Sequence, residues 1–246
     1  MLSSKLQYTF NSKFLQSIQN SNKIPLIVTG PSGVGKSTFV EKLINETFPN
    51  QFQQTINYTS RQPRPQEKHG KDYYFIKTDQ FKSMIKQDKF IEYSHHYNTY
   101  YGSCKQEVLR IIEEQNKIPI FVVDITGSIN ILSNINIINR IFIAPPSIET
   151  LRNRLIARGT ETTEKINLRI SKAQEEINIM EKSGYYNKDN IILNDDFDQS
   201  YQNFVEKVQK MCQLNLNYQQ KISEQILQKL QDQNIQNLEK QEQQIV

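Results

Sequence analysis

The segment Gly30–Thr38 constrains this chain more than any other, because it reads GPSGVGKST and fits the phosphate-loop pattern G-x-x-x-x-G-K-[ST]. An apolar run at residues 24–28 precedes it, and residues 39–44 have the composition of a helix. In such a strand–loop–helix unit, glycines let backbone N–H groups point at phosphate oxygens, and the helix N-terminus adds favourable positive charge. Lys36 can then reach the β and γ phosphates, and the Ser37 hydroxyl can bind Mg²⁺. The segment therefore predicts a nucleotide site rather than a glycine-rich turn without a ligand.

Length and composition fit one sizeable domain with appendages, since 246 residues can bury enough surface to fold alone. The formal net charge is only +4, which gives no reason to expect a nucleic-acid partner. Cys104 and Cys212 lack metal-ligand spacing and are expected to be free thiols. No apolar run approaches the roughly 18 residues that a membrane span requires. These properties predict a soluble cytoplasmic protein without a membrane partner.

Residues 1–23 form a distinct N-terminal extension that contains lysines but no acidic residue. Apolar side chains recur in it at every fourth position, namely at Leu2, Leu6, Phe10, Phe14 and Ile18. This spacing places them along one side of a helix. Transit peptides are also amphipathic and poor in acid, but they are rich in arginine, which this segment lacks. We expect a disordered or packed extension, with organelle targeting as the alternative.

Residues 212–246 form a tail of different composition, in which 15 of 35 residues are Gln or Asn. Ile222, Ile226 and Leu230 could form a short apolar stripe, but no heptad pattern is sustained. The composition predicts a solvated helix or a disordered tail, and the alternative is a coiled-coil or partner segment.

Between these ends, over about residues 24–211, short apolar runs alternate with helix-like segments, which predicts an α/β fold. Strand-like runs occur at residues 120–124, 141–144 and 191–193, and the first of them ends in the carboxylate Asp124. Several of these strands are expected to run parallel, with crossover helices between them. The sequence thus predicts a parallel sheet core that carries the phosphate loop.

Two segments depart from this alternation. Residues 52–101 are rich in Thr, Tyr, Arg and Pro in short stretches, which predicts a small β-rich insertion with a helix near residues 79–87. Residues 147–182 are expected to be helical almost throughout, with a loop at residues 158–160.

The insertion holds the residue types that bind a second phosphate. Arg61 and Arg64 flank a proline, and Tyr73 and Tyr101 follow them. Guanidinium groups bind a phosphate dianion in a planar, bidentate way, and tyrosine hydroxyls add neutral donors. By spacing alone, an ordinary surface pair of arginines beside aromatic residues stays open as the alternative.

The chain resembles the guanylate kinase family over residues 24 to about 210. The matching stretches occur in the family's order and with near-family spacing. They are Gly30–Thr38, residues 59–64, 70–73, 81–85, 90–92, 100–103, 142–147, 158–162 and 194–196.

The resemblance implies a P-loop NTPase fold with a parallel sheet core, a GMP-binding insertion at about residues 55–104 and a helical lid at about residues 147–182. It implies transfer of a phosphoryl group from ATP to GMP with Mg²⁺ as cofactor and dGMP as a further acceptor. The chain is expected to act as a monomer.

The resemblance also implies a role for individual residues. Around GMP it places Arg61, Arg64, Tyr73 and Tyr101 at the phosphate, and Glu92, Ser103, Asp124 and Asn57 at or near the guanine. A carboxylate suits guanine because it accepts from both N1–H and the 2-amino group, a donor pair that adenine lacks. Around ATP the implied residues are Gly30, Pro31, Ser32, Gly33, Val34, Gly35, Lys36, Ser37, Thr38 and Asn194, with Ser37 on the metal.

Catalysis is expected from Lys36 together with the lid arginines Arg154, Arg158 and Arg169, which the resemblance places near the ATP phosphates. Phosphoryl transfer brings two anions together, and positioning and electrostatic stabilisation supply most of its catalysis. Without the resemblance, the arginines would be interpreted as a solvated basic helix face. No covalent intermediate or general base is expected.

Two positions depart from the family. Val122 stands where the family usually has an acidic residue that helps to order the Mg²⁺ shell, and Asp124 is a candidate to compensate as the carboxylate at the strand end. Asn57 replaces a serine near the GMP site, and its larger amide keeps donor and acceptor capacity.

Two alternative functions are therefore weighed against the kinase. A non-catalytic guanylate-kinase-like module that binds phosphorylated proteins typically has a degraded phosphate loop, whereas this loop is complete. A related kinase with another phosphorylated acceptor is disfavoured by the guanine-matching Glu92 and Ser103.

Overall fold

The computed structural model of the chain describes residues 13–96, 98–136, 138–157, 159, 162–212 and 228. The chain divides into two compact units, Met1–Lys207 and Val208–Val246. In the second unit, residues 208–212 and 228 are described and are helical, while the rest of the predicted tail lies outside the described residues. The elements of the fold and the candidate site belong to the first unit.

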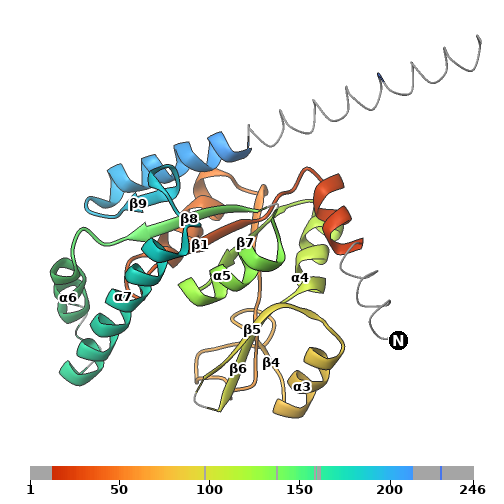
Figure 1. The fold of residues 1–246 in the computed structure, drawn as a ribbon, viewed down its shortest axis with the longest axis horizontal. Helices are drawn as coiled ribbons and strands as arrows, with labels where there is room; N and C mark the ends of the chain where they lie inside the picture. Colours follow the sequence, from red (N-terminus) through yellow and green to blue (C-terminus); the bar gives the residue numbers. More distant parts are fainter. Residues whose placement is uncertain are drawn as a thin grey trace, which may run out of the picture. The chain divides into compact units, whose positions relative to one another are not determined.

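The first unit is built on a five-stranded sheet with the order β2-β7-β1-β8-β9 (Figure 1). Its strands are β1 (Leu26–Thr29), β2 (Phe52–Gln54), β7 (Ile118–Val122), β8 (Asn139–Ala144) and β9 (Ile191–Leu193). All four neighbouring pairs are parallel. Because crossover helices cover both faces of a parallel sheet, its strands are nearly continuous apolar runs, as in β1, whose four residues are all buried. The predicted parallel core is thus confirmed.

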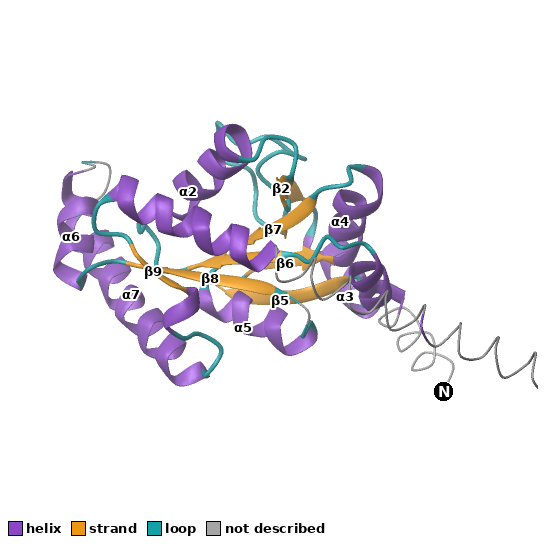
Figure 2. Ribbon diagram, turned by 90° about the horizontal axis from the view of Figure 1, so that it is seen from above, coloured by secondary structure: helices purple, strands orange, loops and turns teal. Residues whose placement is uncertain are grey.

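Helices α2 (Lys36–Lys42) and α5 (Ile125–Asn134) lie on opposite faces of this sheet (Figure 2). A π-helical turn, η1 (Leu43–Thr47), continues α2, and residues 197–207 are helical and pack on it, with the ring of Phe204 5.4 Å from that of Phe39. The chain leaves β1 toward β2 and leaves β7 toward β8, which are opposite directions across the sheet. Right-handed crossovers in opposite directions place their helices on opposite faces.

A second, four-stranded sheet with the order β4-β3-β6-β5 forms the insertion. It contains β3 (Tyr58–Thr59), β4 (Tyr74–Phe75), β5 (Phe90–His96), β6 (Thr99–Cys104) and helix α3 (Thr78–Lys86). The rings of Phe81 on α3 and Phe90 on β5 stack with centroids 4.4 Å apart, which fixes the helix on the sheet. The β-rich insertion and its helix are confirmed, but residues 52–54 belong to the main sheet as β2, because Phe52 is buried there beside β7.

The remaining helices connect and flank these sheets. Helix α4 (Lys105–Leu109) and the π-helical turn η2 (Arg110–Glu114) lead from the insertion back to β7. Helices α6 (Ile148–Ala157) and α7 (Thr163–Ser183) pack on each other at one end of the main sheet (Figure 1), and η3 (Lys188–Asn190) precedes β9. Their bounds confirm the predicted helical segment at residues 147–182.

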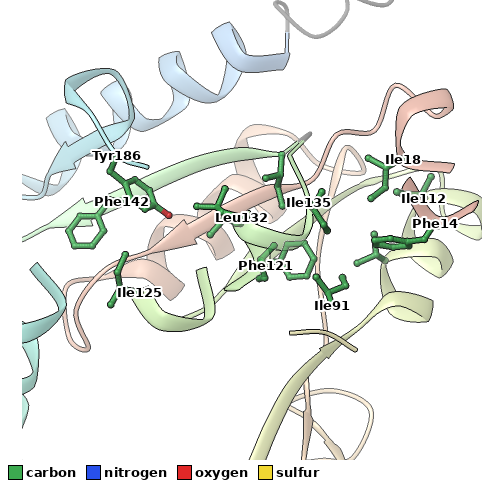
Figure 3. Close-up of a cluster of buried hydrophobic side chains, with 14 of the residues drawn as sticks. Phe14, Ile18, Ile91, Ile112, Phe121, Ile125, Leu132, Ile135, Phe142 and Tyr186 are labelled. Carbon is green, nitrogen blue, oxygen red and sulfur yellow. The ribbon is translucent and has the colours of Figure 1, made fainter. Parts of the chain in front are cut away.

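The main hydrophobic cluster lies between the sheet, α5 and a helix at residues 13–20 (Figure 3). Phe14 and Ile18 of that helix are buried together with Ile91 of β5 and Phe121 of β7. Residues 13–20 are therefore packed, and we expect the folded unit to begin before residue 24. The other predicted members of this apolar face, Leu2, Leu6 and Phe10, lie outside the described residues.

Within the described part of the chain, no helix is both long enough and apolar enough to cross a bilayer.

Candidate active site

The phosphate loop connects the carboxyl end of β1 to the first turn of α2. At Gly30, with a φ of 141°, an added Cβ would lie 2.1 Å from the carbonyl oxygen of Ile143, so that no other residue fits there without moving β8. Gly35 precedes α2 with a φ of 104°. The loop therefore takes its shape from glycine backbone that the neighbouring strand encloses. β1 is the central strand, and the crevice beyond its carboxyl end is where open parallel sheets bind ligands.

Lys36 lies at the start of α2, and its ammonium donates to the carbonyl oxygens of Gly30 and, at 3.0 Å, of Pro31. Burial lowers the pKa of Lys36, while the negative charges of Glu176 and Asp124 oppose that shift. The lysine is thus held at the loop, where it is expected to contact the phosphates of the nucleotide.

The Mg²⁺ expectation rests on Ser37, which is exposed in the first turn of α2. Mg²⁺ in nucleotide sites takes one or two protein ligands, substrate phosphates and several waters. The described residues contain no cluster of three or more acidic, His or Cys side chains that would form an all-protein metal cage. A single hydroxyl beside a phosphate loop therefore fits this cofactor when it arrives with ATP.

Asn194 follows β9 and supports the loop from the side. Its buried amide nitrogen donates to the carbonyl of Val34 at 2.7 Å, and its Oδ1 has no hydrogen-bond partner among the described residues. The guanidinium of Arg154 donates to the carbonyls of Asn194 and Asp195, each at 2.8 Å. Asn194 and Arg154 therefore lie together beside the phosphate loop.

The other predicted lid arginines differ in what the structure describes. Arg169 on α7 donates to the hydroxyl of Ser32 in the phosphate loop at 2.8 Å. Arg158 lies outside the described residues.

On the insertion, Arg61 is held by a carboxylate that the sequence interpretation missed. Its two terminal nitrogens donate to the two oxygens of Glu67 at 2.6 and 2.7 Å, and this bond lowers the pKa of Glu67 to about 2. The guanidinium also lies 5.2 Å from the centre of the Tyr73 ring. The backbone N–H of Arg64, whose side chain is exposed, donates to Glu67 at 2.8 Å. The sequence signal that could have revealed this pair is the acidic residue six positions after Arg61.

Glu92 on β5 is buried and forms a network with the next strand. Ser103 Oγ donates to Glu92 Oε1 at 2.8 Å and lies 3.2 Å from the Oδ1 of Asn57. A register irregularity between Phe90 and Glu92 turns β5 locally. Burial raises the pKa of Glu92 to about 7, and the Ser103 bond opposes that rise. The predicted guanine residues Glu92, Ser103 and Asn57 are thus brought together.

Asp124 corrects the sequence prediction at the end of β7. The strand ends at Val122 rather than at Asp124, because Asp124 is the N-cap of α5. Its Oδ1 accepts the backbone N–H of Gly127 at 2.9 Å, which satisfies a free donor of the helix. Asp124 is therefore not a strand-end carboxylate, although it does line the site.

A cavity of about 820 Å³ opens between the phosphate loop and the insertion; we call it the central cavity. The carboxylate of Glu176, on α7, is 5% exposed, and burial raises its pKa to about 7. Sequence interpretation missed Glu176 and its neighbour Lys172, since an acid and a lysine on a polar helix carry no local signal. The cavity lining includes Ser32, Asn57, Tyr73, Glu92, Tyr101, Val122, Asp124, Lys172 and Glu176.

Known proteins resemble this chain along most of its length. The sequence model described as "Guanylate kinase" matches residues 22–211. The guanylate kinase of Mycoplasma mobile is 41% identical over 68% of this chain and 85% of the relative. That of Pasteurella multocida is 37% identical over 83% of this chain and 95% of the relative. The crystal structure of guanylate kinase from Anaplasma phagocytophilum shares the fold, with a TM-score of 0.55, 24% identity, and coverage of 76% of this chain and 85% of that one.

Proposed function

Since the chain belongs to the guanylate kinase family, we propose that it transfers the γ-phosphoryl group of ATP to GMP, yielding ADP and GDP, and that dGMP is a further acceptor. The observation that carries this proposal is the central cavity, which is lined by Ser32 of the phosphate loop on one side and by Glu92 and Tyr101 of the insertion on the other. Both nucleotides would meet in this space with their phosphates facing each other.

On the donor side, the loop N–H groups and Lys36 would bind the ATP phosphates, and Ser37 would hold Mg²⁺, which neutralises phosphate charge when bound. Asn194 supports the loop through its bond to Val34. Arg154, Arg158 and Arg169 would supply positive charge from the lid, at about residues 147–182. Closure of this lid over the cavity would also exclude water from it.

On the acceptor side, Arg61, Arg64, Tyr73 and Tyr101 would bind the phosphate of GMP, with Glu67 competing for Arg61. Ionised Glu92 would accept from N1–H and the 2-amino group of guanine, with Ser103, Asn57 and Asp124 around it. Wrong bases would not supply the two donors that the buried Glu92 would accept from guanine, and that penalty is the source of base selectivity.

For the oligomeric state, the compartment and the partners, the proposal is the one that the sequence predicts. We propose a monomeric cytoplasmic enzyme whose partners are ATP and GMP, without a nucleic-acid or membrane partner. Size-exclusion chromatography with light scattering at assay concentration tests the oligomeric state.

The test is a coupled assay of ADP and GDP formation with ATP and Mg²⁺, offering GMP, dGMP, AMP, UMP and CMP in parallel. We expect turnover with GMP and dGMP alone. Absence of turnover with every acceptor, from protein shown to be folded, would support the phosphoprotein-binding alternative and make Val122 the first residue to restore to Asp. Faster turnover with another acceptor would replace GMP in the proposal.

A further inference from the structure

Lys172 lies on the face of α7 that is turned toward the central cavity. It is one helical turn after Arg169, which bonds Ser32 of the phosphate loop at 2.8 Å, and one turn before the buried Glu176. Residues three, four and seven apart share one side of a helix. The cavity that Lys172 lines is also lined by Tyr73 and Tyr101. Its ammonium is therefore carried between the two phosphate sites.

Two carboxylates from different elements hold Lys172. Its Nζ lies 3.9 Å from Asp124 Oδ2, at the start of α5, and 3.9 Å from Glu176 Oε1. These are ion-pair distances, longer than the 2.7–3.2 Å of a hydrogen bond. Within the described part of the chain, Lys172 has these two ion pairs and no hydrogen bond, and its side chain is 62% exposed. The ammonium is thus attracted to one place while its three donors can still take a ligand.

The neighbouring cations are fixed differently. Lys36 donates to loop carbonyls, Arg154 to the carbonyls after β9, and Arg61 to Glu67. Each of these groups must change a close contact before it binds a phosphate oxygen. Lys172 needs to give up only two long ion pairs, and a phosphate dianion offers a stronger partner in the same cavity.

The charges around the central cavity also favour binding of a phosphate by Lys172. Asp124, Glu176 and Glu92 bring three carboxylates to a cavity that is expected to receive two phosphates. A further cation between them lowers the electrostatic cost of bringing the phosphates together.

We propose that Lys172 is a further catalytic residue, whose ammonium binds the acceptor phosphate as the transferred group approaches it. Asp124 and Glu176 act as positioning residues that hold the ammonium at the cavity until it binds that phosphate. The proposal rests on the proposed function, which supplies both the transfer reaction and the acceptor, GMP.

The experiment compares Lys172→Met, Lys172→Arg and the matched control Lys182→Met, which changes an exposed lysine later on the same helix. Binding of GMP and of guanosine is measured by calorimetry, and kcat and both KM values are measured by the coupled assay. For Lys172→Met we expect kcat to fall about 10- to 100-fold and GMP affinity to fall about tenfold, with guanosine affinity and the KM for ATP unchanged within about twofold. Lys172→Arg should recover most of the loss.

Three outcomes would overturn the proposal: GMP affinity and kcat within twofold of wild type, an equal loss of guanosine affinity, or an equal loss in Lys182→Met. Thermal unfolding of each variant separates a folding defect from a lost contact, and Lys172→Arg provides the readout if Lys172→Met does not fold. Failure of the wild-type chain to bind GMP would instead refute the proposed acceptor, independently of Lys172.

Discussion

Backbone shapes the donor side of the central cavity, whereas side chains shape its acceptor side. The phosphate loop owes its form to glycine backbone enclosed by β8, as the 2.1 Å approach at Gly30 shows. The acceptor side depends on the Arg61–Glu67 pair and on the network of Glu92, Ser103 and Asn57. A backbone-built site requires a contiguous sequence pattern, while a side-chain-built site can draw its members from distant strands. The phosphate loop on the donor side should therefore tolerate few substitutions. On the acceptor side, a single substitution should impair either phosphate binding or base recognition, but not both.

The strongest test on the donor side is Lys36→Met, because this single ammonium is expected to contact both the β and the γ phosphate of ATP in the transition state. We expect kcat to fall about 10³-fold. Steady-state kinetics with GMP measures it, and Lys42→Met, at the other end of α2, serves as the control that should keep wild-type activity. A loss of less than tenfold would mean that Lys36 is not a main catalytic group of the donor side.

The two sides share one core, and Phe14→Ala tests how far they depend on it. Phe14 is 3% exposed in the cluster with Ile91 and Phe121, so its truncation should lower the free energy of unfolding by about 3–5 kcal/mol. Denaturant unfolding measures this, with half-buried Leu15→Ala as a milder control. Both KM values should stay within about twofold of wild type. A selective rise in the KM for GMP would show that the N-terminal helix supports the acceptor side specifically.

Glu92→Gln should impair the acceptor side alone, since an amide cannot accept from both guanine donors. We expect kcat/KM for GMP to fall about 100-fold at pH 8, with the KM for ATP unchanged. An increase in the KM for both nucleotides would contradict the expectation that the acceptor side can be impaired without the donor side.

The same carboxylate predicts a pH dependence. Because burial raises the pKa of Glu92 from 4.5 to about 7, the folded protein binds more protons there than the unfolded chain does between these values. Its contribution to the free energy of unfolding therefore falls as pH rises through that window. Only the ionised form is expected to bind guanine, so kcat/KM for GMP should rise as pH increases through about 7. The difference between wild type and Glu92→Gln isolates this effect from titration of Glu176 and of the GMP phosphate.

The smallest expected effect comes from Glu67→Gln, which weakens the pairing with Arg61. A phosphate then competes with a neutral amide, so the KM for GMP should fall about two- to fivefold. The KM for ATP serves as the internal control. A rise in the KM for GMP would mean that Glu67 chiefly orders the loop through its bond to Arg64.

These contrasts also explain which features the sequence could predict. The phosphate loop and the strands β1, β8 and β9 are contiguous patterns, and they were predicted close to their observed bounds. Asp124 was misinterpreted because the apolar run before it continues past Val122, and only the hydrogen bond to Gly127 reveals a helix cap. Lys172 and Glu176 escaped notice because their place in the cavity depends on how α7 packs. The roles of the individual site residues stay predictions.

The helix at residues 13–20 has a consequence for how the chain acquires its structure. Phe14 and Ile18 leave the ribosome before Phe121 and Ile135 of the same cluster, which are synthesised much later. Their apolar side chains therefore cannot reach the native core while the insertion is being translated. Contacts so distant in sequence close slowly. During that interval the nascent chain exposes an apolar segment, and exposed apolar segments promote aggregation.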